Sequence, residues 1–221
     1  MGVEAATPPA VALLRDFVNT REPQVALESL GSATALRDWL AGHGLVPPAA
    51  RLAPADLSTA LSLREGLREV LIEHAGQSPD AAAVDALNRV LAAYPTRLVF
   101  DHDGGYRLVS GDDGSFEQAV GRLADAVRQA SEDGTWRRLK VCARDTCRWA
   151  FYDASRNQVR RWCSMAGCGN HSKMQRAYAA RKTRTRQNPP GSRSDPWGDG
   201  VARGAGSEAV RCAPLAATCW A

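Results

Sequence analysis

The sequence predicts an α+β protein with three parts: a mainly helical N-terminal domain containing a β-hairpin, a small treble-clef-like four-cysteine zinc module, and a disordered tail. Three observations predict this arrangement. Apolar residues recur every three to four positions through much of the first 130 residues, which is the spacing of helices with one buried face. Four cysteines then occur as two close pairs. Near the C-terminus the chain becomes rich in Pro, Gly and Ser and loses its periodicity.

The length of 221 residues is enough for one domain with a hydrophobic core and one small module. We predict boundaries at residues 10–133 for the helical domain, 134–186 for the zinc module and 187–221 for the tail. No run of about 18 apolar residues is present, so we expect no membrane span. The N-terminus lacks the basic and apolar regions of a secretory signal, and we therefore expect a cytoplasmic protein.

Residues with known preferences for helix ends divide the first domain. A helix is expected from Val11, and Ser32 or Thr34 is expected to cap the next one. Pro54 opens a longer helix, and Ser78 followed by proline predicts the start of another. The β-prone runs on either side of residues 103–105, Asp-Gly-Gly, predict a β-hairpin. Ser115 then caps the last helix of this domain.

The cysteine pairs have the spacing of a metal site. Cys142-x4-Cys147 and Cys163-x4-Cys168 are separated by fifteen residues. Two such pairs fit one tetrahedral zinc ion held by four thiolates, and cytosolic thiols bind metal more often than they form disulfides. The alternatives are unliganded core cysteines, disulfides or an iron–sulfur cluster. We expect one structural Zn²⁺, because four thiolates leave no coordination position for a reactive water.

The segments around these cysteines predict the topology of the zinc module. Residues 136–147 resemble a strand that enters a metal knuckle, and residues 148–163 a hairpin that turns near Ser155. Cys168 is expected to start a basic helix in which Met174 and Tyr178, four residues apart, pack inward. Trp149 and Trp162 either stack on bases or form the core of the module, and we favour the core. Cys212 and Cys219 in the tail are expected to be incidental thiols.

The net charge of +4 conceals a strong asymmetry. Residues 134–186 contain fourteen Lys and Arg but only two acidic residues, whereas the rest of the chain contains fourteen basic and twenty-two acidic residues. A basic block of this kind is typical of proteins that bind a polyanion. The candidate nucleic-acid contacts lie in the loop before Cys163 and on the last helix: Arg156, Arg160, Arg161, His171, Lys173 and Arg176.

The sequence gives only weak indications of a functional site elsewhere in the chain. Asn19, Arg21 and Arg64 are candidates for a small-molecule pocket in the helical domain, although polar residues at helix ends are more often caps and ion-pair partners. The sequence has neither a Ser/His/Asp arrangement nor a phosphate-binding glycine loop. We therefore predict no catalytic residues and no enzymatic activity.

Residues 139–181 resemble the CGNR zinc-finger family, on the motifs FYDxSRN, RRWCSM and CGN. The preceding part, with DFVNT, DWL and LREGLREV in that order, resembles the ABATE domain. This resemblance implies a bacterial stress-induced transcription regulator in which the four cysteines bind zinc and the finger binds DNA. The arginine that gives the CGNR family its name is replaced here by His171, which would weaken its contact or make it sensitive to pH.

These observations lead to one main hypothesis and two alternatives. The main hypothesis is a zinc-dependent DNA-binding transcription regulator whose N-terminal domain binds a ligand or mediates homodimerisation. An RNA-binding module is the first alternative, because aromatic residues lie beside arginines. A protein-interaction adaptor is the second, in which the basic face docks an acidic protein.

Overall fold

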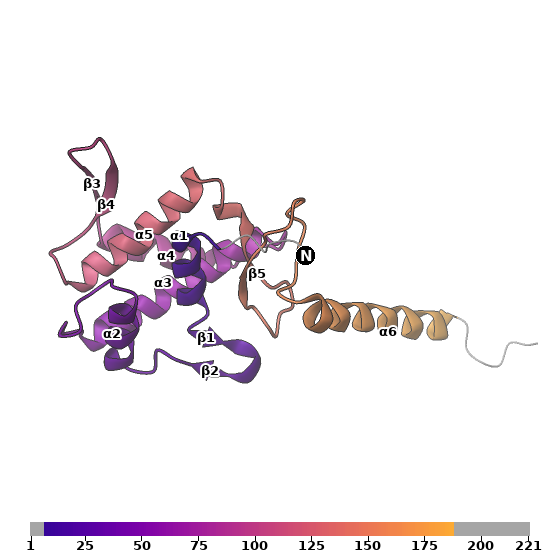
Figure 1. The fold of residues 1–221 in the computed structure, drawn as a ribbon. Helices are drawn as coiled ribbons and strands as arrows, with labels where there is room; N and C mark the ends of the chain where they lie inside the picture. The colour runs from indigo at the N-terminus through magenta and orange to yellow at the C-terminus, as the bar shows by residue number, and fades with distance from the viewer. Residues whose placement is uncertain (1–6, 188–221) are drawn as a thin grey trace, which may run out of the picture. The chain divides into compact units, whose positions relative to one another are not determined.

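The computed structural model describes residues 7–187, apart from the side chains of residues 185 and 186, and its fold is mixed α+β as predicted (Figure 1). Residues up to Tyr178 belong to one compact unit, and the chain divides after this residue. Most of the predicted tail, together with Cys212 and Cys219, lies outside the described residues. The predicted boundary between a helical domain and a zinc module stays a prediction.

Five helices form the body of the protein: α1 (Pro9–Val18), α2 (Ala33–Gly42), α3 (Pro54–Glu73), α4 (Ala81–Ala93) and α5 (Phe116–Glu132). Ser32 and Ser115 cap α2 and α5 as predicted, since each side chain accepts a hydrogen bond from a backbone N–H three residues on. The predicted start of α4 at Ser78 is wrong. Asp80 is the cap, because its side chain accepts from Ala82 N–H while its own N–H donates to Glu69.

The longest helix, α3, packs against α1, α2 and α4, and also against the strand β5 (Leu139–Val141). Its buried side chains include Leu63, Leu67 and Leu71. Gly66 allows a close approach of α4, because a Cβ atom built at this glycine would lie only 2.4 Å from the Cβ of Leu87. The contact between α3 and α4 therefore depends on the absence of a side chain at this position.

The described residues also form three antiparallel strand pairs. β3 (Arg97–Phe100) pairs with β4 (Tyr106–Val109), as predicted, and projects from the helices in Figure 1. β1 (Arg21–Glu22) and β2 (Leu27–Glu28) form a pair that the sequence analysis missed, since two-residue strands carry no readable alternation. The third pair joins β5 to β6 (Ala150–Tyr152). The predicted hairpin within residues 148–163 is therefore wrong, because β6 pairs with β5, which precedes the first cysteine pair, rather than with a strand after Ser155.

The β5–β6 hairpin is part of the main hydrophobic core. Leu139, Val141 and Ala150 are fully buried in the same cluster as the side chains of the helices. The amide of Asn19, at the end of α1, forms two hydrogen bonds with the backbone of Ala150, at 2.9 and 2.8 Å. Arg148, next to the cysteine knuckle, pairs with Glu69 of α3 at 2.6 Å. The helical body therefore holds the zinc-binding hairpin in place.

Helix α6 (Asn170–Gln187) follows a π-helical turn, η3 (Met165–Gly169), that contains Cys168. The predicted inward packing of Met174 and Tyr178 is wrong, because these side chains are 73% and 71% exposed. Apolar contacts to the cysteine cluster come instead from Phe151, Trp149 and Trp162.

None of the helices in the described part of the chain has the length and the apolar character needed to cross a membrane.

We predict that Arg68→Met lowers the free energy of unfolding by about 3 kcal/mol. Arg68 is 1% exposed, and its guanidinium group donates to the backbone oxygens of Val18 and Arg148, both at 2.6 Å. Methionine fills a similar volume but leaves these buried carbonyl groups without donors. Urea unfolding of the zinc-loaded protein, followed by circular dichroism, measures the effect.

The matched control is Arg107→Met, because the side chain of Arg107 is 52% exposed on β4. This control is expected to change stability by less than about 0.5 kcal/mol. Equal unfolding midpoints for the two variants would contradict the structural role of Arg68.

Candidate metal centre

Four cysteine sulfur atoms converge at one point of the structure. The Sγ atoms of Cys142, Cys147, Cys163 and Cys168 all lie within 4.8 Å of one another. Cys163 Sγ is 3.7 Å from that of Cys147 and 3.8 Å from that of Cys168. Four thiolates about 2.3 Å from a tetrahedral zinc ion are about 3.8 Å apart, so the cluster has the size of a zinc site. These separations are far longer than a disulfide bond.

Local backbone structure places each sulfur. Cys142 directly follows β5, and Cys147 ends a tight turn in which its N–H donates to Arg144 O at 2.9 Å. Arg148 then adopts a left-handed conformation, with φ at 49°, and reverses the chain into β6. In the second pair, Ser164 accepts a hydrogen bond from Gly167 N–H at 3.2 Å and so closes the turn that presents Cys168.

The electrostatics of the cluster favour a divalent cation. Hydrogen bonds from Cys147 and Cys163 lower the pKa of the Cys142 thiol well below its ordinary value. The hydrogen bond with Cys142 raises the pKa of the Cys147 thiol. Hydrogen bonds with Cys142 and Cys147 raise the pKa of the Cys163 thiol. One thiolate is therefore easily formed, whereas several adjacent thiolates require a positive charge among them. Four soft sulfur ligands in a tetrahedral set suit zinc in this role.

The surroundings of the cluster suit a structural ion. Cys142, Cys147 and Cys168 are buried, with Trp149 and Trp162 packed against them. This packing confirms the preference for a core role of the two tryptophans. The chain thus has one structural zinc site, and its four thiolates would fill the coordination shell. Arg144 Nη1, 4.0 Å from Cys168 Sγ, places a positive charge beside the negatively charged thiolates.

A buried carboxylate organises the loop between the two cysteine pairs. Asp153 is completely buried and accepts hydrogen bonds from the N–H and Oγ of Ser155, from Arg160 N–H at 3.0 Å and from Lys140 Nζ at 2.9 Å. Burial alone would raise the pKa of Asp153, but the hydrogen bonds from Ser155 and Lys140 outweigh it and hold the pKa below its ordinary value. The stabilising contribution of Asp153 is therefore present above that ordinary value and is lost as pH falls through the folded-state pKa.

The predicted contacts of the loop divide into two kinds. Arg156 and Arg161 are exposed. Arg160 is half-buried, because its guanidinium group donates to Cys163 O at 2.8 Å and lies 5.0 Å from the centre of the Phe151 ring. Arg160 thus supports the metal-binding loop, whereas Arg156 and Arg161 face solvent.

The predicted contacts on α6 divide similarly. Lys173 and Arg176 are exposed. His171 instead lines a pocket of about 290 Å³ together with Arg144 and Gln175. Among the described residues, His171 Nδ1 and Arg144 Nε are buried without a hydrogen-bond partner. The residue that replaces the arginine of the CGNR motif therefore lies against the cysteine knuckle.

The three candidate pocket residues of the helical body make structural contacts. Asn19 joins α1 to β6, as described above. The buried guanidinium group of Arg64 donates to both carboxylate oxygens of Glu28 at 2.7 Å. Arg21 is half-exposed and lies 3.7 Å from Glu65. Their predicted role in binding a small molecule stays a prediction.

Sequence reasoning missed the supporting residues of the metal site. Lys140 is surrounded by apolar residues in the sequence, and nothing in that local pattern identifies its partner thirteen positions later. Asp153 lies inside the FYDxSRN motif, which indicated a family but not a function for this carboxylate. A lysine between two apolar residues of a short strand, with an acidic residue in a later turn, is the sequence signal for such a buried pair.

The hydrophobic core of the helical body extends into the β5–β6 hairpin, and the turn of this hairpin carries two of the four cysteines of the metal site. This combination defines a zinc-finger protein. Residues 138–182 match the CGNR zinc finger. Residues 11–148 match the ABATE family, which is described as a putative stress-induced transcription regulator. The chain belongs to the ABATE family and carries a CGNR zinc finger at its C-terminal side. A comparison with curated proteins found no match.

We predict that Cys163→Ser weakens zinc binding at least about 100-fold, because a hydroxyl group replaces one of four thiolate ligands. Zinc content after dialysis against a competing chelator measures this loss. The double variant Cys212→Ser/Cys219→Ser is the control and is expected to retain one zinc per chain. Zinc lost from this control, or retained by Cys163→Ser, would contradict the ligand set.

We also predict that Asp153→Asn lowers the free energy of unfolding at pH 7 by about 3 kcal/mol, because it leaves the buried ammonium group of Lys140 without its counter-charge. Asp145→Asn is the control, since Asp145 is exposed in the same module. Urea unfolding at saturating zinc compares the two variants. A variant at position 153 as stable as the control would show that the carboxylate does not hold the loop.

Proposed function

We propose that the protein is a zinc-dependent DNA-binding transcription regulator of the bacterial cytoplasm, without enzymatic activity. In this proposal, zinc fixes the two cysteine pairs, and the loop at 154–162 and the first turns of α6 contact the DNA backbone. Membership of the ABATE family and the zinc finger support a regulatory role. The closed coordination shell supports a structural rather than a catalytic use of the metal.

One observation carries the proposal. The guanidinium groups of Arg161 and Arg176 lie 5.9 and 5.8 Å from the centre of the same Trp162 ring. Arg161 belongs to the loop and Arg176 to α6, so basic side chains from two separate segments meet at one place. Trp162 itself packs against the cysteine cluster. The position of this basic surface therefore depends directly on the metal site.

The charges that remain exposed suit a polyanion. Of the fourteen basic residues at 134–186, Arg137, Lys140 and Arg148 form ion pairs with acidic groups of the protein. Arg156, Arg161, Lys173 and Arg176 are exposed, and arginine and lysine side chains of this kind bind phosphates and release counterions. Arg160 and His171 are proposed to position this surface rather than to contact DNA directly.

A protein-interaction adaptor is the second candidate. Its support is the exposure of Met165, Met174 and Tyr178 beside these basic groups, since aromatic residues, methionine and arginine are enriched in protein interfaces. The RNA-binding alternative rests on the same basic surface, and a comparison of nucleic acids distinguishes it.

We predict that Arg156→Ala/Lys173→Ala weakens binding to duplex DNA about tenfold and reduces the salt slope by about two, because each side chain neutralises one phosphate. Fluorescence anisotropy with a labelled duplex at several salt concentrations measures both quantities. Arg51→Ala, an exposed arginine in the helical body, is the matched control and is expected to bind as the unchanged protein does.

An unchanged affinity and slope in the double variant would contradict the proposed surface. Tighter binding to single-stranded RNA than to the duplex would favour the RNA-binding alternative. Recovery of an acidic protein partner that survives nuclease treatment, without duplex binding, would favour the adaptor.

A further inference from the structure

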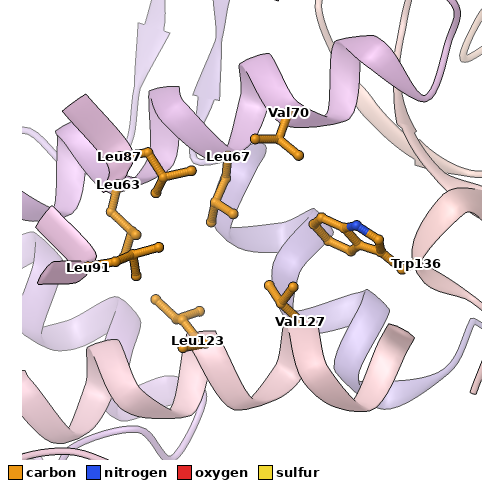
Figure 2. Close-up of a pocket in the computed structure, with 9 residues that line it drawn as sticks. Leu63, Leu67, Val70, Leu87, Leu91, Leu123, Val127 and Trp136 are labelled. Atoms are coloured by element: carbon orange, nitrogen blue, oxygen red, sulfur yellow. The ribbon is translucent and has the colours of Figure 1, made fainter. Parts of the chain in front are cut away.

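The helical body contains an apolar cavity that is separate from the zinc site. It has a volume of about 260 Å³ and lies between α3, α4 and α5. Figure 2 shows Leu63 and Leu67 with Leu87 and Leu91 on one side, and Val127 opposite them. Trp136 lies at one end of the pocket. Because Val70, Leu91 and Trp136 are only half-buried, the cavity is a pocket that opens to solvent rather than a closed void in the core.

We propose that this cavity binds a small, uncharged, apolar molecule. The indole nitrogen of Trp136 is the only polar side-chain atom among the residues that line it. A water molecule in such a site finds too few hydrogen-bond partners, and a charged ligand finds no counter-charge. An engineered apolar cavity of about 150 Å³ in another protein binds benzene, so the larger cavity here has room for a bicyclic aromatic molecule of about ten carbon atoms.

The depth of the cavity argues for a small molecule rather than a second protein surface. Leu63, Leu67 and Leu87 are only 3%, 7% and 4% exposed, so a flat protein surface cannot reach them. Val70, Leu91 and Trp136 are half-buried and form the accessible part of the lining. A compact ligand that enters there would contact apolar side chains of α3, α4 and α5.

The position of Trp136 connects this cavity to the zinc-binding hairpin. Trp136 begins the 3₁₀ turn η2 (Trp136–Arg138), which leads directly into β5 and Cys142. Its ring lies edge-on to His74 at 5.1 Å, and His74 Nδ1 is 2.8 Å from Leu139 O in β5. The indole ring is therefore linked, through His74 and through the chain itself, to the strand that precedes the first zinc ligand.

The test is a titration of the full-length, zinc-loaded protein with naphthalene, followed by the indole N–H signals in ¹⁵N-edited NMR spectra. Trp136→Phe identifies the signal of Trp136. We expect that signal to shift saturably with naphthalene but not with naphthalene-2-sulfonate, whose charge the cavity cannot accommodate. No DNA is present, so the result does not depend on the proposed function.

Val127→Phe fills the cavity with a ring and is expected to raise the dissociation constant for naphthalene at least tenfold. Val25→Phe is the matched control, because Val25 is 61% exposed, and it is expected to bind as the unchanged protein does. Melting temperatures verify that both variants fold, and Leu91→Phe is a second filling variant. Absence of a saturable shift, or full affinity in both folded filling variants, would overturn the proposal.

Discussion

The β5–β6 hairpin belongs to the hydrophobic core and to the zinc site at once, and the arrangement of the whole compact unit follows from this constraint. Leu139, Val141 and Ala150 are buried with the helices, while Cys142 and Cys147 lie in the turn that joins the two strands. Arg68 reinforces this connection, because it donates hydrogen bonds both to α1 and to the knuckle. Metal binding and folding of the helical body are therefore expected to be coupled.

The same constraint explains how a chain with a modest net charge presents a basic surface. Lys140 and Asp153 neutralise each other in the interior, and Asp153 also fixes the backbone of the loop through Ser155 and Arg160. Zinc fixes the far end of the loop at Cys163. With both ends held, the backbone of the loop loses little conformational freedom on binding, which favours affinity for a polyanion.

The sequence predicted the parts that depend on local chemistry and missed those that depend on distant partners. Cysteine spacing and family motifs predicted the metal site, and capping serines predicted the starts of α2 and α5. The pairing of β6 with β5 was missed, because strand partners are chosen by packing across the chain rather than by local alternation. The cavity beside Trp136 was also missed, since leucines at helical spacing predict a buried face but not a gap within it.

The most direct test of this account is fluorescence anisotropy of a labelled duplex with the full-length protein, compared with zinc bound and after chelation. Cys163→Ser, with its incomplete ligand set, is measured alongside. We expect binding that requires zinc, falls steeply with salt and is lost in the variant. Equal binding with and without zinc would contradict the claim that the metal site creates the DNA-binding surface.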